Sequence, residues 1–186
     1  DCTGHGVPGA LVSMIGITLL KQTIDHQHIV QPGEILSNMQ KEIYSFLQRG
    51  SSDGMDISLC SVNHEKKILS YAGAMMRLLM VRDGAITEIK GDRVSISRNA
   101  SFDAAFTNHT IEFKKGDLFY LFTDGYCDQF GGEKKRKFMF KRFKELLTDI
   151  QHLSIGEQKS ILESTHKEWR GELEQVDDIL VIGFKL

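Results

Sequence analysis

Apolar residues recur at three- and four-residue steps in the first quarter of the chain, a pattern that predicts two helices. The first is predicted over residues 7–21, where Pro8 fits a first helical turn. Apolar side chains leave it almost no polar face, so we expect it to be buried on most sides. The second is predicted over residues 33–48, with one apolar face and charged positions toward water.

Apolar and polar residues then alternate, which is the pattern of half-buried strands. Polar residues 63–67 and the sequence Arg82-Asp83-Gly84 predict tight turns between neighbouring strands. The last strand of this region is wholly apolar, as expected for a strand buried on both faces. Because the connections are too short for crossovers, most pairings should be antiparallel. The predicted strands cover residues 55–60, 68–72, 78–81, 86–89, 111–113 and 118–122.

Helical spacing returns near the end of the chain, over residues 138–147. A further helix should begin at the capping-box sequence Ser154-Ile155-Gly156-Glu157 and end near Trp169, which would anchor it. Residues 179–184 are predicted to form a final strand. Helices, then strands, then helices and a strand indicate an α+β fold around one core. Because no repeat or linker interrupts the pattern, we expect residues 1–186 to form one domain.

Composition narrows the class of protein. The 23 Lys and Arg residues nearly balance 25 Asp and Glu residues, and 41% of the chain is hydrophobic. The hydrophobic content and the balanced charge exclude a disordered chain. The charge balance also gives no chain-wide positive surface that would bind nucleic acid or an anionic membrane. The apolar stretch at residues 11–20 is too short to cross a bilayer. Three cysteines, Cys2, Cys60 and Cys127, lack zinc-finger spacing and favour a reducing, cytoplasmic compartment.

The chain begins on the polar, glycine-rich sequence Asp1-Cys2-Thr3-Gly4-His5-Gly6, without an initiator methionine. A natural chain rarely starts inside such a loop. We therefore expect a fragment of a longer signalling protein.

Acidic residues stand at the edges of apolar elements in three places. Asp1 precedes the first helix, Asp124 follows the apolar strand, and Asp177 and Asp178 precede the last strand. Carboxylates held near one another are the ligands that Mg²⁺ and Mn²⁺ prefer. Each position alone is weak evidence, because an Asp-Gly pair is commonly a plain turn. We interpret Asp53-Gly54 and Asp83-Gly84 in that way.

Six motifs strengthen the case for a metal site because they occur in a particular order along the chain. They are Asp1-Cys2-Thr3-Gly4-His5-Gly6-Val7-Pro8-Gly9-Ala10, Pro32-Gly33-Glu34-Ile35-Leu36, Tyr71-Ala72-Gly73-Ala74, Lys115-Gly116-Asp117, Phe122-Thr123-Asp124-Gly125 and Asp177-Asp178-Ile179. Over essentially the whole chain this series resembles the SpoIIE-type branch of the metal-dependent (type 2C) serine/threonine protein phosphatases. The resemblance implies an antiparallel β-sandwich flanked by helices in αββα layers. It also implies a centre of two Mn²⁺ or Mg²⁺ ions at one edge.

The resemblance assigns metal ligands residue by residue. Asp1 is similar to the aspartate that bridges both ions, and Cys2 would offer its backbone carbonyl. Asp124 and Asp177 are similar to the other carboxylate ligands of one ion. Asp178 is similar to the polar neighbour that supports the last ligand.

The glycine-rich opening has its own implied roles. Gly4 and Gly6 would let the backbone pass close to the ions, because glycine has no Cβ to clash. His5 would donate a proton to the leaving serine or threonine oxygen. Alternatively, His5 is an ordinary loop histidine at a helix start, and the sequence leaves both interpretations open.

The implied reaction is hydrolysis of phosphoserine or phosphothreonine on a regulatory protein by a metal-activated water. In this branch the substrate is usually a small phosphorylated anti-anti-sigma-type (STAS) protein of a bacterial partner-switching pathway. An upstream sensor domain and a homodimer are further expected partners, coupled through the two N-terminal helices unless those helices are only core packing. Nucleic acid and membrane contacts are not expected. The alternative function is a catalytically silent, phosphatase-like regulatory binding module.

A departure from the family pattern qualifies these expectations. An upstream Gly-Asp motif, whose aspartate holds the second ion, has no counterpart in this chain. We therefore expect the sheet to lack its first strands and residues 1–186 alone to be feebly active. Separately, the basic run Lys134-Lys135-Arg136-Lys137, followed by Lys141 and Arg142, is either a docking site for a phosphoprotein or a solvated loop.

Overall fold

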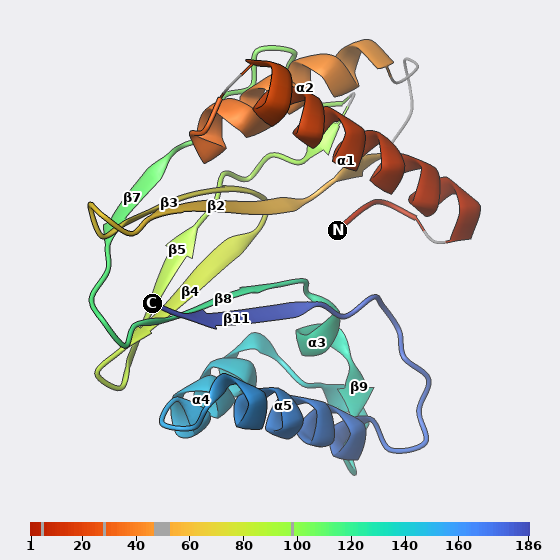
Figure 1. Cartoon of the computed structure of the whole chain (residues 1–186). Helices are drawn as coiled ribbons and strands as arrows, with labels where there is room; N and C mark the ends of the chain where they lie inside the picture. Colours follow the sequence, from red (N-terminus) through yellow and green to blue (C-terminus); the bar gives the residue numbers. More distant parts are fainter. Residues whose placement is uncertain (5, 28, 47–52, 98) are drawn as a thin grey trace. The chain divides into compact units, whose positions relative to one another are not determined.

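The computed structural model describes residues 1–4, 6–27, 29–46, 53–97 and 99–186 (Figure 1). Its elements group into two compact units. The first unit comprises Asp1–Leu78 with Ile89–Phe113, and the second comprises Leu79–Glu88 with Lys114–Leu186. Each unit has a separate hydrophobic core, so each can be described by itself.

In its described residues the first unit has two helices and two antiparallel sheets, a pair and a three-stranded sheet in the order β2-β3-β7. The predicted hairpin of β2 and β3 is confirmed, with Ile57 opposite Ala74 and Asn63 opposite Ile68. Figure 1 shows α1 and α2 together on one side of this sheet. The elements are α1 (Gly6–Gln27), α2 (Pro32–Phe46), β1 (Gly54–Met55), β2 (Ile57–Asn63), β3 (Ile68–Ala74), β6 (Ile96–Ser97) and β7 (His109–Glu112).

Helix α2 forms as its period predicted and buries its apolar face in the core of the first unit. Leu36 and Ile43 are both fully buried, and they pack in one cluster with Ala72 of β3. Gln40 is also fully buried. Its amide donates to the Ser97 carbonyl oxygen at 2.9 Å and accepts from the Ser97 amide at 2.9 Å. These two bonds fix α2 to β6, because an unpaired buried amide would be costly.

The burial predicted for α1 is wrong. The helix forms, but only one face is buried, through Gly9, Val12, Gly16, Leu19 and Thr23 at three- and four-residue steps. A Cβ at Gly16 would lie 2.9 Å from the Met55 sulfur, so glycine permits the close approach on that face. The opposite face exposes large side chains, because no other described element of the first unit covers it. They are Val7 (74%), Leu11 (57%), Met14 (65%) and Ile17 (57%).

Helix α1 is also longer than the apolar stretch that the sequence showed. Its window Gly6–Asp25 is long and apolar enough to span a membrane by length and composition, with a mean hydropathy of 1.4. Val12 and Leu19 nevertheless pack in the core cluster that contains α2 residues. Length and composition alone do not assign a membrane span, because core helices of soluble proteins pass the same test.

The second unit has a four-stranded sheet in the order β11-β8-β4-β5. Strands β8 and β11 are antiparallel, with Phe122 opposite Val181 and Leu118 opposite Lys185. Figure 1 shows α4 and α5 on one side of these two strands. The elements are β4 (Arg77–Arg82), β5 (Ala85–Lys90), β8 (Leu118–Phe122), α3 (Gly125–Asp128), β9 (Phe130–Gly131), β10 (Arg136–Lys137), α4 (Phe140–Ile150), α5 (Ile155–Arg170) and β11 (Val181–Lys185).

Three predictions for the second unit are confirmed. Strand β8 is buried at four of its five positions. The capping box opens α5, because the Ser154 side chain and the Glu157 side chain each bond the other residue's backbone amide. Trp169 anchors the end of α5, where its indole N–H donates to the Gln129 carbonyl oxygen at 3.0 Å.

Several of the shortest elements were not predicted from the sequence. Strands β1, β6, β9 and β10 have two residues each, too few to show a period. The interpretation of Asp53-Gly54 as a turn is wrong, because Gly54 lies in β1 opposite Ser97, where a Cβ would press against the neighbouring strand. Asp83-Gly84 is a turn as predicted, with φ values of 49° and 82°.

Candidate functional site

Asp124 stands where the buried strand β8 gives way to a short helix. The Thr123 amide still donates to the Leu180 carbonyl oxygen at 3.0 Å, so strand pairing continues one residue past Phe122. Asp124 then begins α3 as its N-cap residue, but its side chain makes no capping hydrogen bond. The residue is exposed. Its carboxylate is therefore not used to close the helix.

Thr123 holds this loop against the segment before β11. Its hydroxyl donates to the Asp178 carbonyl oxygen at 3.0 Å and accepts from the Leu180 amide at 3.0 Å. Gly125 packs so closely on the same carbonyl that a Cβ there would collide with it. The structure therefore brings together the two segments that carry Asp124 and Asp177. That their carboxylates share a metal ion stays a prediction.

Asp177 and Asp178 form an exposed turn ahead of β11. The Asp177 carboxylate accepts from the Asp178 amide at 2.8 Å, and the Asp177 carbonyl accepts from the Gln175 side chain at 2.8 Å. These bonds fix the backbone of the turn. Asp178 thus contributes through its backbone to the position of its neighbour.

A lysine that we did not assign to the site lies near Asp124. The Lys137 ammonium donates to the Asp128 carboxylate at 2.7 Å. This hydrogen bond is the main cause, and the Asp124 charge a smaller one, of a pKa for Lys137 above its ordinary value. The only signal in the sequence is the four-residue step from Asp124 to Asp128, which places both on one side of a helical turn.

The opening segment of the chain belongs to the first unit. Residue Asp1 donates its amino group to the Asp56 carbonyl oxygen at 3.0 Å and accepts from the Asp56 amide at 2.7 Å. Cys2 forms an antiparallel bridge with Met55. Gly4 and Gly6 both have positive φ values, 91° and 67°, which glycine adopts without strain. His5 lies outside the described residues.

The predicted ligands therefore fall into two sets. Asp1 and Cys2 are fixed within the first unit, and Asp124, Asp177 and Asp178 within the second. Among the described residues, no group of three His, Cys, Asp or Glu side chains could hold a metal ion. Within the second unit, the exposed carboxylates of Asp124 and Asp177 on adjoining segments have the hard oxygen chemistry that suits Mg²⁺ or Mn²⁺. The two-ion site itself stays a prediction.

Comparison with known proteins identifies the family to which the chain belongs. The family model described as Stage II sporulation protein E (SpoIIE) matches residues 1–186. The chain belongs to the SpoIIE family. No curated protein matches it.

Solved structures similar to this SpoIIE-family chain share its fold. The SiaA-PP2C domain of Pseudomonas aeruginosa has a TM-score of 0.91 and 34% identity, over 100% of this chain and 73% of that one. The PP2C phosphatase domain of SpoIIE from Bacillus subtilis, with a fragment of its regulatory domain, has a TM-score of 0.76 and 15% identity. That match covers 100% of this chain and 52% of the other.

A third neighbour is the catalytic domain of the serine/threonine protein phosphatase PstP, in complex with two manganese ions. It has a TM-score of 0.66 and 15% identity, over 98% of this chain and 83% of that one. The second and third likenesses show the fold alone. Together the comparisons confirm the predicted fold class, in which helices flank antiparallel sheets as in type 2C phosphatases.

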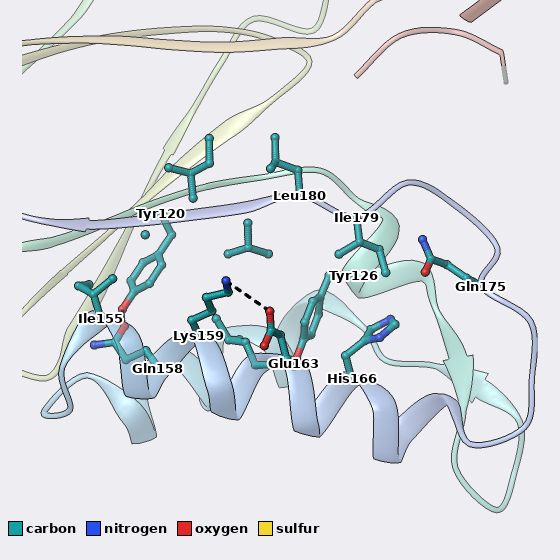
Figure 2. A pocket seen from close by; sticks show the side chains of 14 residues that line it. Tyr120, Tyr126, Ile155, Gln158, Lys159, Glu163, His166, Gln175, Ile179 and Leu180 are labelled. Atoms are coloured by element: carbon teal, nitrogen blue, oxygen red, sulfur yellow. Dashed lines mark hydrogen bonds and ion pairs between the residues drawn. The ribbon is translucent and has the colours of Figure 1, made fainter. Parts of the chain in front are cut away.

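The second unit of this SpoIIE-family chain also has a hollow of about 610 Å³ between α5 and β11 (Figure 2). Two pairs of its polar side chains bond each other: the Tyr120 hydroxyl donates to the Gln158 side chain at 2.6 Å, and Lys159 pairs with Glu163 at 3.7 Å. Burial and, less strongly, the Arg170 charge lower the pKa of His166. Its ring packs on Tyr126 at 5.2 Å between centroids. We interpret this hollow as structural, because it lacks the acidic groups of the candidate site.

Proposed function

We propose that this SpoIIE-family chain is a metal-dependent protein phosphatase domain that hydrolyses phosphoserine or phosphothreonine on a regulatory protein. Family membership over the whole chain supports the reaction class. The observation that carries the proposal is the pair of hydrogen bonds from Thr123, which hold Asp124 beside the Asp177-Asp178 turn. The carboxylates of Asp124, Asp177 and Asp178 do not contribute to packing of the hydrophobic core, because all three residues are exposed.

The residues have distinct proposed roles. Asp1, Asp124 and Asp177 would hold Mn²⁺ or Mg²⁺, with Cys2 contributing its carbonyl. When bound, such ions activate water and offset the charge on phosphoryl oxygens. Lys137, which Asp128 holds near Asp124, would attract the phosphorylated side chain.

Two further residues complete the proposal. Gly125 permits the close approach of the Asp178 backbone, which keeps the Asp177 turn in place. His5 would donate a proton to the serine or threonine oxygen as it leaves, since a histidine titrates near neutral pH.

The substrate class is the finer part of the proposal. We propose a small phosphorylated regulatory protein of the STAS type, with a sensor domain elsewhere in the parent protein and a homodimer as the working state. In the Bacillus subtilis SpoIIE structure a fragment of a regulatory domain accompanies the phosphatase domain. That arrangement supports a regulated domain in this chain too.

The test measures metal binding and hydrolysis separately. Calorimetric titration of residues 1–186 with Mn²⁺ should show binding that Asp124→Asn removes. The matched control is Asp149→Asn, an exposed aspartate of α4, which should leave binding unchanged. The natural full-length protein should hydrolyse p-nitrophenyl phosphate only with Mn²⁺ or Mg²⁺, and Asp124→Asn should abolish that activity.

Each result has a definite meaning. A rate that survives metal chelation, or that survives Asp124→Asn, would show that the proposed reaction is wrong. Manganese binding without hydrolysis of either p-nitrophenyl phosphate or phosphoproteins would favour the silent binding module instead.

A further inference from the structure

Residues 130–142, which we call the basic hairpin, concentrate positive charge in a chain of net charge −2. They contain four consecutive basic residues, Lys134 to Lys137, followed by Lys141 and Arg142, against the single carboxylate of Glu133. The hairpin comprises β9, β10, the turn between them and the start of α4. The sequence left it open whether this stretch is only a solvated loop.

The structure shows an ordered hairpin that is anchored on both sides. Arg136 lies opposite Gly131, and Lys137 lies opposite Phe130. The Gly132 amide donates to the Trp169 carbonyl oxygen at 2.8 Å, and the glycines pack so closely on Trp169 that a Cβ at Gly131 would collide with it.

The second anchor joins the hairpin to α3, the helix that Asp124 begins. The Phe138 amide donates to the Gln129 carbonyl oxygen at 2.9 Å, and the Met139 amide donates to the Cys127 carbonyl oxygen at 2.8 Å. The ion pair of Lys137 with Asp128 lies on the same side. The hairpin therefore has a fixed position relative to the Asp124 loop.

Lys137 pairs with Asp128, and Lys141 pairs with Glu145 at 3.9 Å, but the other positive charges of the hairpin lack carboxylate partners in the described part of the chain. Within the part of the chain that the structure describes, Lys134, Lys135 and Arg136 are exposed and no carboxylate pairs with them. Arg142 stacks on the Trp169 ring at 4.2 Å, which orients its guanidinium without neutralising it. Packing cations this closely is unfavourable for an isolated domain, and an anionic partner would remove the repulsion.

A hollow of about 650 Å³ lies along the hairpin. Cationic side chains line it together with Phe138, Met139 and Trp169, and two carboxylates, Glu133 and Glu145, stand among them. Arginine, tryptophan and methionine are enriched at protein interfaces relative to the rest of the surface. The two carboxylates would repel the continuous phosphate chain of a nucleic acid, whereas a peptide can place its acidic groups between them.

We propose that the basic hairpin is a docking surface for an acidic segment of the protein partner. The proposal rests on the proposed function for the partner's role as the phosphorylated substrate. In that arrangement the hairpin holds an acidic stretch of the substrate while the phosphorylated residue reaches the loop of Asp124, to which the hairpin is fixed.

The test uses residues 1–186 in the presence of a metal chelator, so that the metal site makes no contribution. Fluorescence anisotropy measures binding of a fluorescein-labelled peptide of alternating Asp and Gly, with the Asn-Gly peptide as its neutral match. The acidic peptide should bind and the neutral one should not, and added salt should weaken binding because it screens exposed charges.

A charge-reversal variant locates the site. Lys134→Glu, Lys135→Glu and Arg136→Glu together should weaken binding by about tenfold or more, because three attractive contacts become repulsive. The matched control changes three exposed lysines elsewhere, Lys66→Glu, Lys90→Glu and Lys115→Glu, and should stay within about twofold of the unaltered chain. Replacing the three hairpin residues by Gln gives a second, milder variant, and circular dichroism checks the folding of each.

Several outcomes would overturn the proposal. They are no binding of the acidic peptide, equal losses in the two triple variants, or tighter hairpin-dependent binding of single-stranded DNA or phosphatidylserine vesicles. Hydrolysis separates this inference from the proposed function. The hairpin variant of the natural full-length protein should hydrolyse p-nitrophenyl phosphate normally. If the unaltered protein hydrolyses nothing yet binds the acidic peptide through the hairpin, the proposed function fails and the docking surface stands.

Discussion

The Thr123 hydroxyl donates a hydrogen bond to the Asp178 carbonyl oxygen over 3.0 Å, across 55 residues of sequence. The Thr123 hydroxyl oxygen also accepts from the Leu180 amide, so one small side chain joins the end of β8 to the segment before β11. This link contributes to the mutual position of both acidic segments of the second unit.

Thr123→Val should loosen the acidic segments. Valine has nearly the same shape but leaves the Asp178 carbonyl and the Leu180 amide without these partners at a largely buried position. We expect a loss of about 1–3 kcal/mol in the free energy of unfolding, measured in urea. Thr123→Ser keeps the hydroxyl and is the control. Equal stability of the Val and Ser variants would show that the link is unimportant.

Gly125→Ala should strain the same junction from the other side. Its Cβ would collide with the Asp178 carbonyl, a backbone atom that cannot rotate away. We expect a loss of about 1–3 kcal/mol in the free energy of unfolding. Gly156→Ala is the matched control, because nothing lies within 4 Å of a Cβ there and alanine favours the helix by about 0.5–1 kcal/mol. The prediction fails if both variants change stability alike.

Asp117 should contribute pH-dependent stability. Only 3% of its side chain is exposed, and it binds Arg82 through both carboxylate oxygens and accepts from the Lys114 amide at 2.7 Å. The Arg82 hydrogen bond first, and the Lys114 amide second, lower the pKa of Asp117. The folded state therefore releases this proton more readily than the unfolded chain does. The stabilisation is complete above the unfolded pKa of about 3.9 and is lost as the pH falls through the lower folded pKa.

Asp117→Asn measures this contribution. At pH 7 the variant should lose about 3 kcal/mol in the free energy of unfolding, because Arg82 keeps a charge without its partner. Its stability should also fall less than that of the unaltered chain between neutral and strongly acidic pH. Asp83→Asn, at an exposed neighbouring position, is the control and should change neither the stability at pH 7 nor its fall at acidic pH. If the unaltered chain and the two variants lose stability alike in acid, the prediction is wrong.

The one-sided burial of α1 predicts a sharp contrast between two leucines. Leu19 is 3% exposed and packs in the core of the first unit, whereas Leu11 is 57% exposed. We expect Leu19→Ala to cost about 2–5 kcal/mol in the free energy of unfolding, since it leaves a cavity. Leu11→Ala should stay within about 0.5 kcal/mol. Comparable losses at both positions would mean that the exposed face is covered in solution.

Much of the fold follows from local pattern. The capping box at Ser154 and the apolar run of β8 can each be predicted from neighbouring residues alone. A helix cap acts over one helical turn, and the period of a strand shows within a few residues. The hairpin at residues 63–67 is of the same kind. Periodicity does not reveal two-residue strands, because two residues are too few to show a period. Gly54 lies in one of these strands, although the sequence predicted a turn there.

The candidate site divides in a similar way. Asp124 and Asp177 stand out in the sequence because each follows or precedes an apolar strand. The role of Thr123 was invisible, since a threonine beside an aspartate has no signature for a hydrogen bond made 55 residues away. Lys137 was hidden within a basic run until its pairing with Asp128 placed it near Asp124.

The amino-acid order alone thus determined where the longer helices and strands occur, which residues are acidic at strand ends, and which family the motifs resemble. Only the tertiary structure decided that α1 leaves one apolar face open, that Thr123 holds two acidic segments together, and that the basic hairpin is anchored to the Asp124 helix. The physical reason is range. Periodicity and capping act between neighbours in the chain, whereas burial and long-range hydrogen bonds depend on which distant segments the folded core brings into contact.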